Sequence, residues 1–274
     1  MPLFSDLPNS AFEEAYFKVR HGDEHVGRLQ NITTLPAEFY KIQWEIEAKN
    51  RILPFAIGDA EAKPESSYLN YTPLLPVRHI AAAIIGDAIH NYRSALDYAA
   101  SAVVSKSKSE FSKRVKFPFA EKHEDLIDNQ SIKKIERALN CSDQKVKKFF
   151  VEYVNSCKDG NYAIWAMNKL NNLDKHEMII PNVTISHIVL YLASLSQPIK
   201  LSNSSIRADA DRPFSLLRAD EPKDYKITEG VTVEIRFPSN SYFPNESVLK
   251  ILTEFQNVVL DILKKFDDLV KELN

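Results

Sequence analysis

The segment from Val77 to Ser105 constrains the fold of this chain more than any other. At 100° per residue, its apolar side chains gather on one broad side of a helix. These residues are Ala81, Ile84, Ile85, Ala88, Ile89, Tyr92, Ala95, Leu96, Ala99, Ala100 and Val103. A helix with so wide an apolar side is packed into a core, so the sequence predicts a helical core built around residues 77–105.

Other segments with helical periodicity extend this core. Apolar residues recur at spacings of three and four in 9–31 and in 247–273, which predicts a helix near each end of the chain. Residues 123–158 predict one or two helices, and residues 161–178 predict another. We therefore expect a helical core at about 77–178, joined by the two terminal helices.

Strands are predicted on both sides of the helical core, at about 39–57 and 183–237. Residues 39–48 alternate apolar and polar side chains, as a half-buried strand does, and 226–237 alternate similarly. The proline-containing segments 58–76 and 202–222 are predicted to be loops. The expected fold class is α+β, with a mainly helical bundle, one small antiparallel sheet from the N- and C-terminal strands, and a single domain over 1–274.

Composition excludes several classes of function. A net charge of -2 gives no overall basic footprint for nucleic acid. The two cysteines have no zinc-site spacing, and their number fits a reducing compartment. No GxGxxG, Walker-type or GxSxG motif occurs, so we expect no nucleotide cofactor. The N-terminus does not resemble a signal peptide and no apolar run could span a bilayer, so we expect a cytoplasmic protein without a membrane partner.

The polar side of helix 77–105 carries the first group of candidate site residues. On that side lie Asp87, His90, Asn91, Arg93, Ser94, Asp97 and Tyr98. The simplest interpretation is a solvated surface, with Arg93 and Asp97 as an i, i+4 ion pair. The functional interpretation is a polar cleft between this helix and helix 161–178.

The second group of candidates lies at the end of helix 161–178. It comprises Asn171, Asn172, Asp174, Lys175 and His176. The structural interpretation is an ordinary helix C-terminus, where Lys175 and His176 complement the negative end of the dipole. In the functional interpretation His176 acts as an acid or base or contacts a phosphate, and Lys175 contacts an anion.

Metal binding is a weaker hypothesis for the same residues. Asp87, His90, Asp97 and His176 are ligand types found in carboxylate–histidine sites. No segment carries an HExxH-type pair, however, so the sequence predicts no metal site.

The blocks GDAIHNYRSALDYAA (86–100), FPF (117–119) and LNNLDKH (170–176) resemble a widespread family of uncharacterised bacterial proteins. Members of that family typically carry GD-x-LHNLRSALDH-x-A and LNN-x-DKHR. The family pattern is in turn similar to the R-x4-6-H signature of HEPN domains. These are helical bundles that often dimerise, and many are metal-independent ribonucleases of toxin or phage-defence systems. The present chain matches at Arg93 but has Tyr98 at the histidine position and Glu177 in place of the final arginine.

Two functional hypotheses follow. The first is a binding or assembly protein without catalysis, which uses the polar cleft and has an RNA, a protein or a second copy of the chain as partner. The alternative, implied by the resemblance, is a HEPN-like ribonuclease in which Arg93 acts with His90 or His176 as catalytic residues. Because Tyr98 is a poor general base at neutral pH, the sequence leaves open whether the protein is an enzyme.

Overall fold

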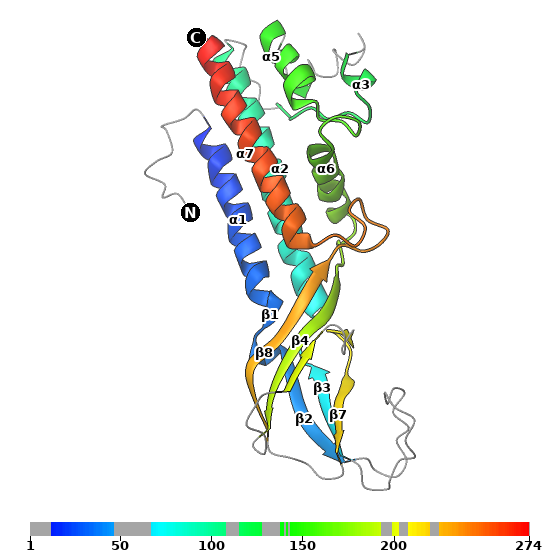
Figure 1. Cartoon of the computed structure of the whole chain (residues 1–274). Coiled ribbons are helices and arrows are strands. Elements are labelled where there is room, and N and C mark those ends of the chain that lie inside the picture. The colour runs from blue at the N-terminus through cyan, green and yellow to red at the C-terminus, as the bar shows by residue number, and fades with distance from the viewer. Residues whose placement is uncertain are drawn as a thin grey trace. The chain divides into compact units, whose positions relative to one another are not determined.

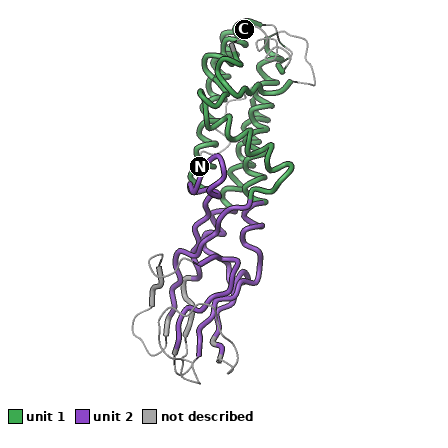
Figure 2. Tube along the Cα trace, turned by 90° about the vertical axis from the view of Figure 1, so that its right-hand side faces the viewer, with its two compact units in different colours: residues 1–27, 83–179, 249–274 green, residues 28–82, 180–248 purple. Residues whose placement is uncertain are grey.

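The computed structural model describes residues 12–46, 67–107, 115–127, 138–139, 141, 143–192, 199–202, 208–219 and 225–273. Its contacts divide the chain into two compact units, each assembled from separate stretches of sequence (Figure 2). Unit 1 comprises residues 1–27, 83–179 and 249–274, and unit 2 comprises residues 28–82 and 180–248. Unit 1 takes most of the predicted helices, and unit 2 takes the predicted strands.

Three long helices dominate the helical part of the chain: α1 (Glu13–Thr33), α2 (Val77–Lys106) and α7 (Val248–Leu273). In unit 1 they lie side by side (Figure 1), and Asp23 of α1 is hydrogen-bonded to both α2 and α7. Shorter helices complete the unit: α3 (Glu124–Ile127), α5 (Gln144–Phe149), the π-helix Phe150–Val154 and α6 (Tyr162–Asp174). The helices predicted at 9–31, 77–105 and 247–273 agree with α1, α2 and α7 to within a few residues, and α6 ends four residues before the predicted position 178.

Aromatic side chains form one centre of the core of unit 1. The ring of Phe266 on α7 lies 6.0 Å from that of Phe12, 5.0 Å from Phe149 and 5.4 Å from Phe150. Phe117 extends the cluster, with its ring 5.4 Å from Phe150. This packing ties the segment that follows α2 to the C-terminal helix.

Local capping explains where α5 and α6 begin. The Asp143 side chain accepts hydrogen bonds from the backbone N–H groups of Lys145 and Val146 at the start of α5. The Asn161 side chain accepts from the N–H of Ile164 at the start of α6. Both are residues favoured at N-caps, because their short side chains reach N–H groups that lack a partner within the helix. Asn155 ends the π-helix in the left-handed region, at φ 43°.

Unit 2 contains two antiparallel sheets. The larger has the order β1-β8-β4-β5, with β6 also paired to β4; its strands are β1 (Thr34–Leu35), β8 (Tyr225–Arg236), β4 (Asn182–Leu192), β5 (Ile199–Ser202) and β6 (Ala208–Asp209). The smaller has the order β2-β3-β7, with strands β2 (Tyr40–Ile46), β3 (Ser67–Pro73) and β7 (Phe214–Ala219). The predicted α+β class and antiparallel pairing are confirmed, but the prediction of one sheet is wrong. Each sheet joins a strand from before the helical core to one from after it.

The two segments predicted as loops contain strands. Residues 58–76 include β3, and residues 202–222 include β6 and β7. In β3 the side chains Ser67 to Tyr71 are all buried, so the strand lacks the polar–apolar alternation of a half-buried one. Its polar Asn70 is buried because Glu45 and Ser215 supply hydrogen bonds. The part of the predicted strand region 39–57 that follows Ile46 lies outside the described residues.

Cys141 and Cys157 are both free and buried. Among the described residues, no helix combines the length and the apolar character needed to cross a bilayer.

Asp23 forms the polar centre of the three-helix contact. Tyr92 Oη donates to Asp23 Oδ1 at 2.8 Å, and Gln256 Nε2 donates to Asp23 Oδ2 at 2.8 Å. Burial raises the pKa of Asp23 above its usual value of 3.8, although both hydrogen bonds act in the opposite direction. The folded protein therefore holds this proton to higher pH than the unfolded chain does.

The resulting prediction concerns pH and the substitution Asp23→Asn. Because the pKa of Asp23 is higher in the folded protein than in the unfolded chain, its protonated carboxyl stabilises the fold. This stabilisation is complete below pH 3.8, the pKa in the unfolded chain, and is lost as pH rises through the pKa in the folded protein. Relative to the Asn variant, which does not titrate, the wild-type protein should lose stability as pH rises from 3.8 toward neutrality. Thermal unfolding of both proteins across this range measures the difference. A wild-type advantage that grows with pH would contradict the raised pKa.

Candidate functional site

Helices α2 and α6 meet through a row of polar contacts, which we call the interhelix row. Its members on α2 and their partners on α6, in antiparallel order, are Gly86 with Asp174, His90 with Asn171, and Arg93 with Asn168. The spacings of three and four residues place each set on one stripe of its helix. The two conspicuous sequence blocks, 86–100 and 170–176, therefore contact each other directly.

Two of the three pairs in the row are joined by hydrogen bonds. His90 Nδ1 lies 3.3 Å from Asn171 Oδ1, and Asn171 is buried. Arg93 Nε donates to Asn168 Oδ1 at 3.0 Å. At Gly86 a Cβ atom would overlap the carboxylate of Asp174, so only glycine lets that side chain lie against the helix backbone. At these positions the two helices bond to each other, and no cleft separates the paired atoms.

Arg93 is the most extensively bonded member of the row. Its side chain is only 12% exposed, and its Nη1 lies 2.7 Å from Asp97 Oδ2. The guanidinium carbon lies 4.4 Å above the centre of the Phe119 ring, a cation–π contact. Asp97 Oδ1 in turn accepts the backbone N–H of Phe117 at 2.7 Å. Arg93 and Asp97 thus hold the FPF element against α2 and α6.

Asp174 has a structural partner as well. Its carboxylate accepts a hydrogen bond from the backbone N–H of Ile179, which fixes the turn after α6. Burial raises its pKa; the Ile179 bond lowers it, nearby Asp87 raises it and His90 lowers it. The Asp174 carboxylate therefore stabilises the turn that follows α6.

The remaining predicted site residues lie toward solvent. Asp87, Tyr98, Asn172, Lys175 and His176 are exposed. Lys175 and His176 follow the last residue of α6, as the helix C-terminus interpretation expected. Among the described residues no hydrogen-bond or ion-pair partner reaches the His176 side chain, so no contact joins it to Arg93 or His90.

Asn91 and Ser94 lie at the edge of the row. Asn91 Oδ1 accepts from Lys18 Nζ at 3.4 Å, and its amide donates to the backbone carbonyl of Asp87 at 2.9 Å. Ser94 Oγ lies 3.5 Å from His90 Nε2, at the limit of a hydrogen bond. Asp87 Oδ2 lies 3.9 Å from His25 Nδ1. Within the described part of the chain, no three His, Cys, Asp or Glu side chains are grouped closely enough to hold a metal ion.

A cavity of about 290 Å³ lies next to the row, between the segment 119–126 and α6. Its lining is Phe119, Ala120, Glu121, Asp125, Leu126, Trp165, Asn168 and Lys169. Asn168 and Phe119 belong to both features, since the first accepts from Arg93 and the second lies under its guanidinium. Two residues that hold the Arg93 side chain in place therefore also form part of the cavity wall.

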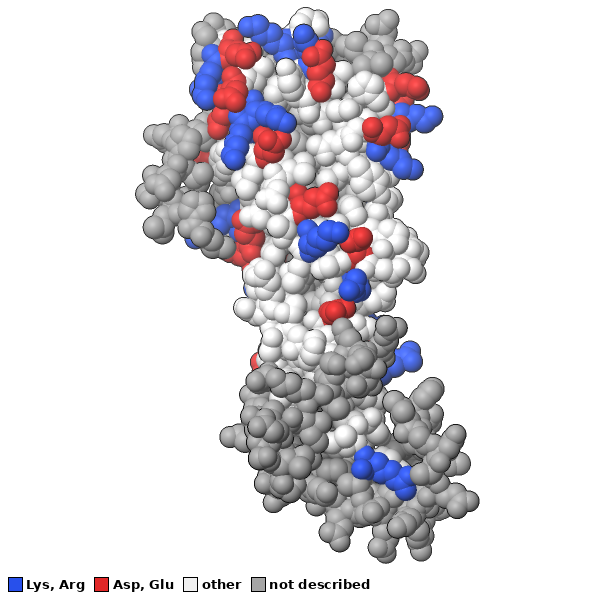
Figure 3. Space-filling view, viewed as in Figure 1, with Lys and Arg blue, Asp and Glu red and all other residues white. Residues whose placement is uncertain are grey.

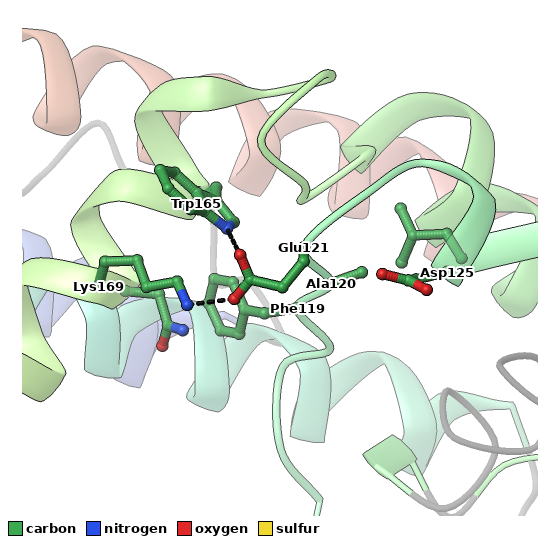
Figure 4. Close-up of a pocket in the computed structure, with 8 residues that line it drawn as sticks. Phe119, Ala120, Glu121, Asp125, Trp165 and Lys169 are labelled. Carbon is green, nitrogen blue, oxygen red and sulfur yellow. Dashed lines mark hydrogen bonds and ion pairs between the residues drawn. The ribbon is translucent and has the colours of Figure 1, made fainter. Parts of the chain in front are cut away.

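Glu121 connects the two walls of the cavity (Figure 4). One carboxylate oxygen is ion-paired with Lys169 Nζ, and the other accepts from Trp165 Nε1 at 3.3 Å. The Lys169 ammonium also lies 5.4 Å from the centre of the Trp165 ring. Glu121 and Lys169 are more than half and about one-third exposed, respectively, so water reaches this pair.

No protein-family model matches the chain, and no curated protein or solved structure is significantly similar to it. The resemblance to the bacterial family and to HEPN domains stays a prediction.

None of the eight cavity residues was among the sequence-predicted site residues, and Glu121, Asp125, Trp165 and Lys169 carry most of its polar groups. Trp165 is buried. Glu121 and Lys169 are 48 residues apart, and no motif links them. The FPF element was the one signal in the sequence near this cavity, because its last residue lines it.

Charges are mixed on the face of the molecule shown in Figure 3. Over the helices visible there, Lys and Arg of the described residues alternate with Asp and Glu. A surface that tracks a nucleic-acid backbone needs a stripe of basic residues. On the described part of this face, no such stripe is present.

Proposed function

We propose that this protein is a non-catalytic binding protein whose small ligand occupies the cavity between segment 119–126 and α6. The observation that carries the proposal is the state of Arg93. Its Nε, Nη1 and ring-stacking face all contact groups of the same chain, and beside them lies a cavity with mixed polar and apolar walls. Small-ligand sites are concave and combine apolar walls with a few placed polar groups.

The ribonuclease alternative receives less support from the same contacts. An arginine that stabilises a phosphate must present free N–H groups to it, whereas Arg93 directs its Nε at Asn168 and holds its Nη1 2.7 Å from Asp97. His90 is bonded to Asn171, and among the described residues no hydrogen bond or ion pair joins His176 to Arg93 or His90. The mixed charge on the described face in Figure 3 points the same way.

Ligand screening by thermal unfolding tests the proposal. A ligand that binds only the folded protein stabilises it by about 2.7 kcal/mol at one hundred times its Kd, which raises Tm by several degrees. A panel of sugars, nucleotides, organic acids, amines and amino acids should contain at least one stabilising compound. If no class stabilises the protein, the cavity does not serve as a binding site for these compounds.

A variant that fills the cavity tests whether the stabilising compound binds there. Ala120→Leu adds volume to the lining and should abolish the stabilisation by the compound found in the screen. Ala83→Leu on the exposed surface of α2 is the matched control and should leave it unchanged. In parallel, total RNA incubated with the protein, with and without EDTA, should stay intact. Metal-independent cleavage would favour the ribonuclease alternative.

A further inference from the structure

We propose that the ligand of this cavity is a small zwitterion with one ammonium and one carboxylate group, of the free amino acid class. This inference rests on the proposed binding function and specifies its ligand. Its basis is the distribution of hydrogen-bond donors and acceptors along the cavity lining. Donors lie on α6, and a carboxylate lies at the start of α3.

The donor end is formed by Asn168 and Lys169, which are adjacent on α6. Arginine can only donate, so the contact with Arg93 Nε fixes Oδ1 of Asn168 on that side. The Nδ2 group, with its two hydrogens, must then point away from Arg93. Lys169 Nζ has three hydrogens and directs one to Glu121, so two remain. Together these groups suit a ligand carboxylate.

The acceptor end is formed by Asp125. Its Oδ2 accepts the backbone N–H of Lys122 at 3.2 Å, which leaves Oδ1 and a further lone pair for a ligand. In Figure 4, Trp165 and Lys169 lie at one end of the labelled residues and Asp125 at the other, with Glu121 between them. This end suits an ammonium group.

The Lys169 ammonium and the Asp125 carboxylate lie at different ends of the cavity (Figure 4). This arrangement argues against ligands that carry two charges of the same sign. A dicarboxylate with one carboxylate on Lys169 would place its second negative charge beside Asp125, and like charges repel. A diamine would similarly lie near the Lys169 ammonium. A zwitterion places each of its charges next to an opposite one.

The apolar part of the lining limits the rest of the ligand. Phe119, Leu126 and Trp165 contribute the apolar surface, and a volume of about 290 Å³ matches a small molecule. An aliphatic side chain of a few carbons would cover these groups. The cavity therefore suits an amino acid of medium size better than a peptide or a nucleotide.

Calorimetric titration with three matched probes tests the inference. The probes are leucine, 4-methylpentanoate, which lacks the amine, and 3-methylbutylamine, which lacks the carboxylate; other encoded amino acids complete the series. We expect at least one amino acid to bind, and at least about tenfold more tightly than its two single-charge analogues. Equal binding of the carboxylate analogue would overturn the inference.

Two variants assign the charged ends. Asp125→Asn should weaken amino acid binding by about tenfold or more and leave the weak binding of 4-methylpentanoate unchanged. Ala120→Leu should abolish both. If the wider screen yields a ligand blocked by Ala120→Leu that is not a zwitterion, the binding function stands and this inference fails. If no compound in that screen binds, the binding function itself fails.

Discussion

Replacing Arg93 with alanine is expected to lower the free energy of unfolding by about 3 kcal/mol. The change removes the ion pair with Asp97, the hydrogen bond to Asn168 and the cation–π contact with Phe119. The side chain is only 12% exposed, so water cannot replace these contacts fully, whereas Asp97 is 40% exposed and recovers part of its hydration. Urea unfolding of the two proteins measures the difference.

Two further variants control for the effect of losing a charge. Lys265→Ala breaks an exposed i, i+4 pair with Asp261 on α7 and should change stability by less than about 0.5 kcal/mol. Arg93→Lys keeps the charge but lacks the planar fork, so we expect it to be intermediate. If Arg93→Ala and Lys265→Ala cost the same, Arg93 does not have the structural role assigned to it.

This prediction also affects any test of catalysis. Because Arg93→Ala is expected to destabilise unit 1, a loss of activity in that variant would not by itself identify a catalytic arginine. An activity assay is informative only when the folded fraction of the variant is measured in the same buffer. His90→Ala is a better probe of chemistry, since His90 is exposed and we expect its loss to cost less stability.

Gly22→Ala is expected to destabilise the protein by about 1–3 kcal/mol, although alanine is the better helix former. A Cβ at Gly22 would overlap the ring of Tyr92 and lie 2.7 Å from its Cδ1. Tyr92 is fully buried, and its hydroxyl is bonded to Asp23. The ring cannot move away without breaking that bond or displacing α2. Thermal or urea unfolding measures the loss.

Gly27 offers a matched control in the same helix. A Cβ there meets nothing within 4 Å, so Gly27→Ala should stabilise the protein by about 0.5–1 kcal/mol through helix propensity alone. Opposite signs for the two substitutions are therefore expected. Stabilisation by both would mean that α1 and α2 are less closely packed at Gly22 than the contacts indicate.

Local patterns in the sequence predicted the helices well. The boundaries of α2 and α7 agree closely with the predictions because an apolar stripe at spacings of three and four is visible in the sequence itself. Strands β4 and β8 were also located near their observed positions. β3 and β7 were missed, and β3 has buried side chains on both faces, so it shows no alternation to detect.

The candidate site was only partly predictable. His90, Arg93, Asp97, Asn171 and Asp174 were all identified from unusual polar residues on otherwise apolar helices. Their pairing across α2 and α6 corresponds to one of the two interpretations of the sequence, a polar cleft between the helices, the other being a solvated surface. Which atoms bond, and that these bonds join the helices directly, depends on how the two helices cross.

The sequence by itself determined the α+β class, the extents of the long helices and the residue types that could carry chemistry, because these follow from local periodicity and side-chain character. Tertiary structure alone decided the two separate sheets, the bonds of Arg93 and the cavity lined by Glu121, Asp125, Trp165 and Lys169. These features join residues tens of positions apart, and the direction of a side chain across such a distance is set by packing.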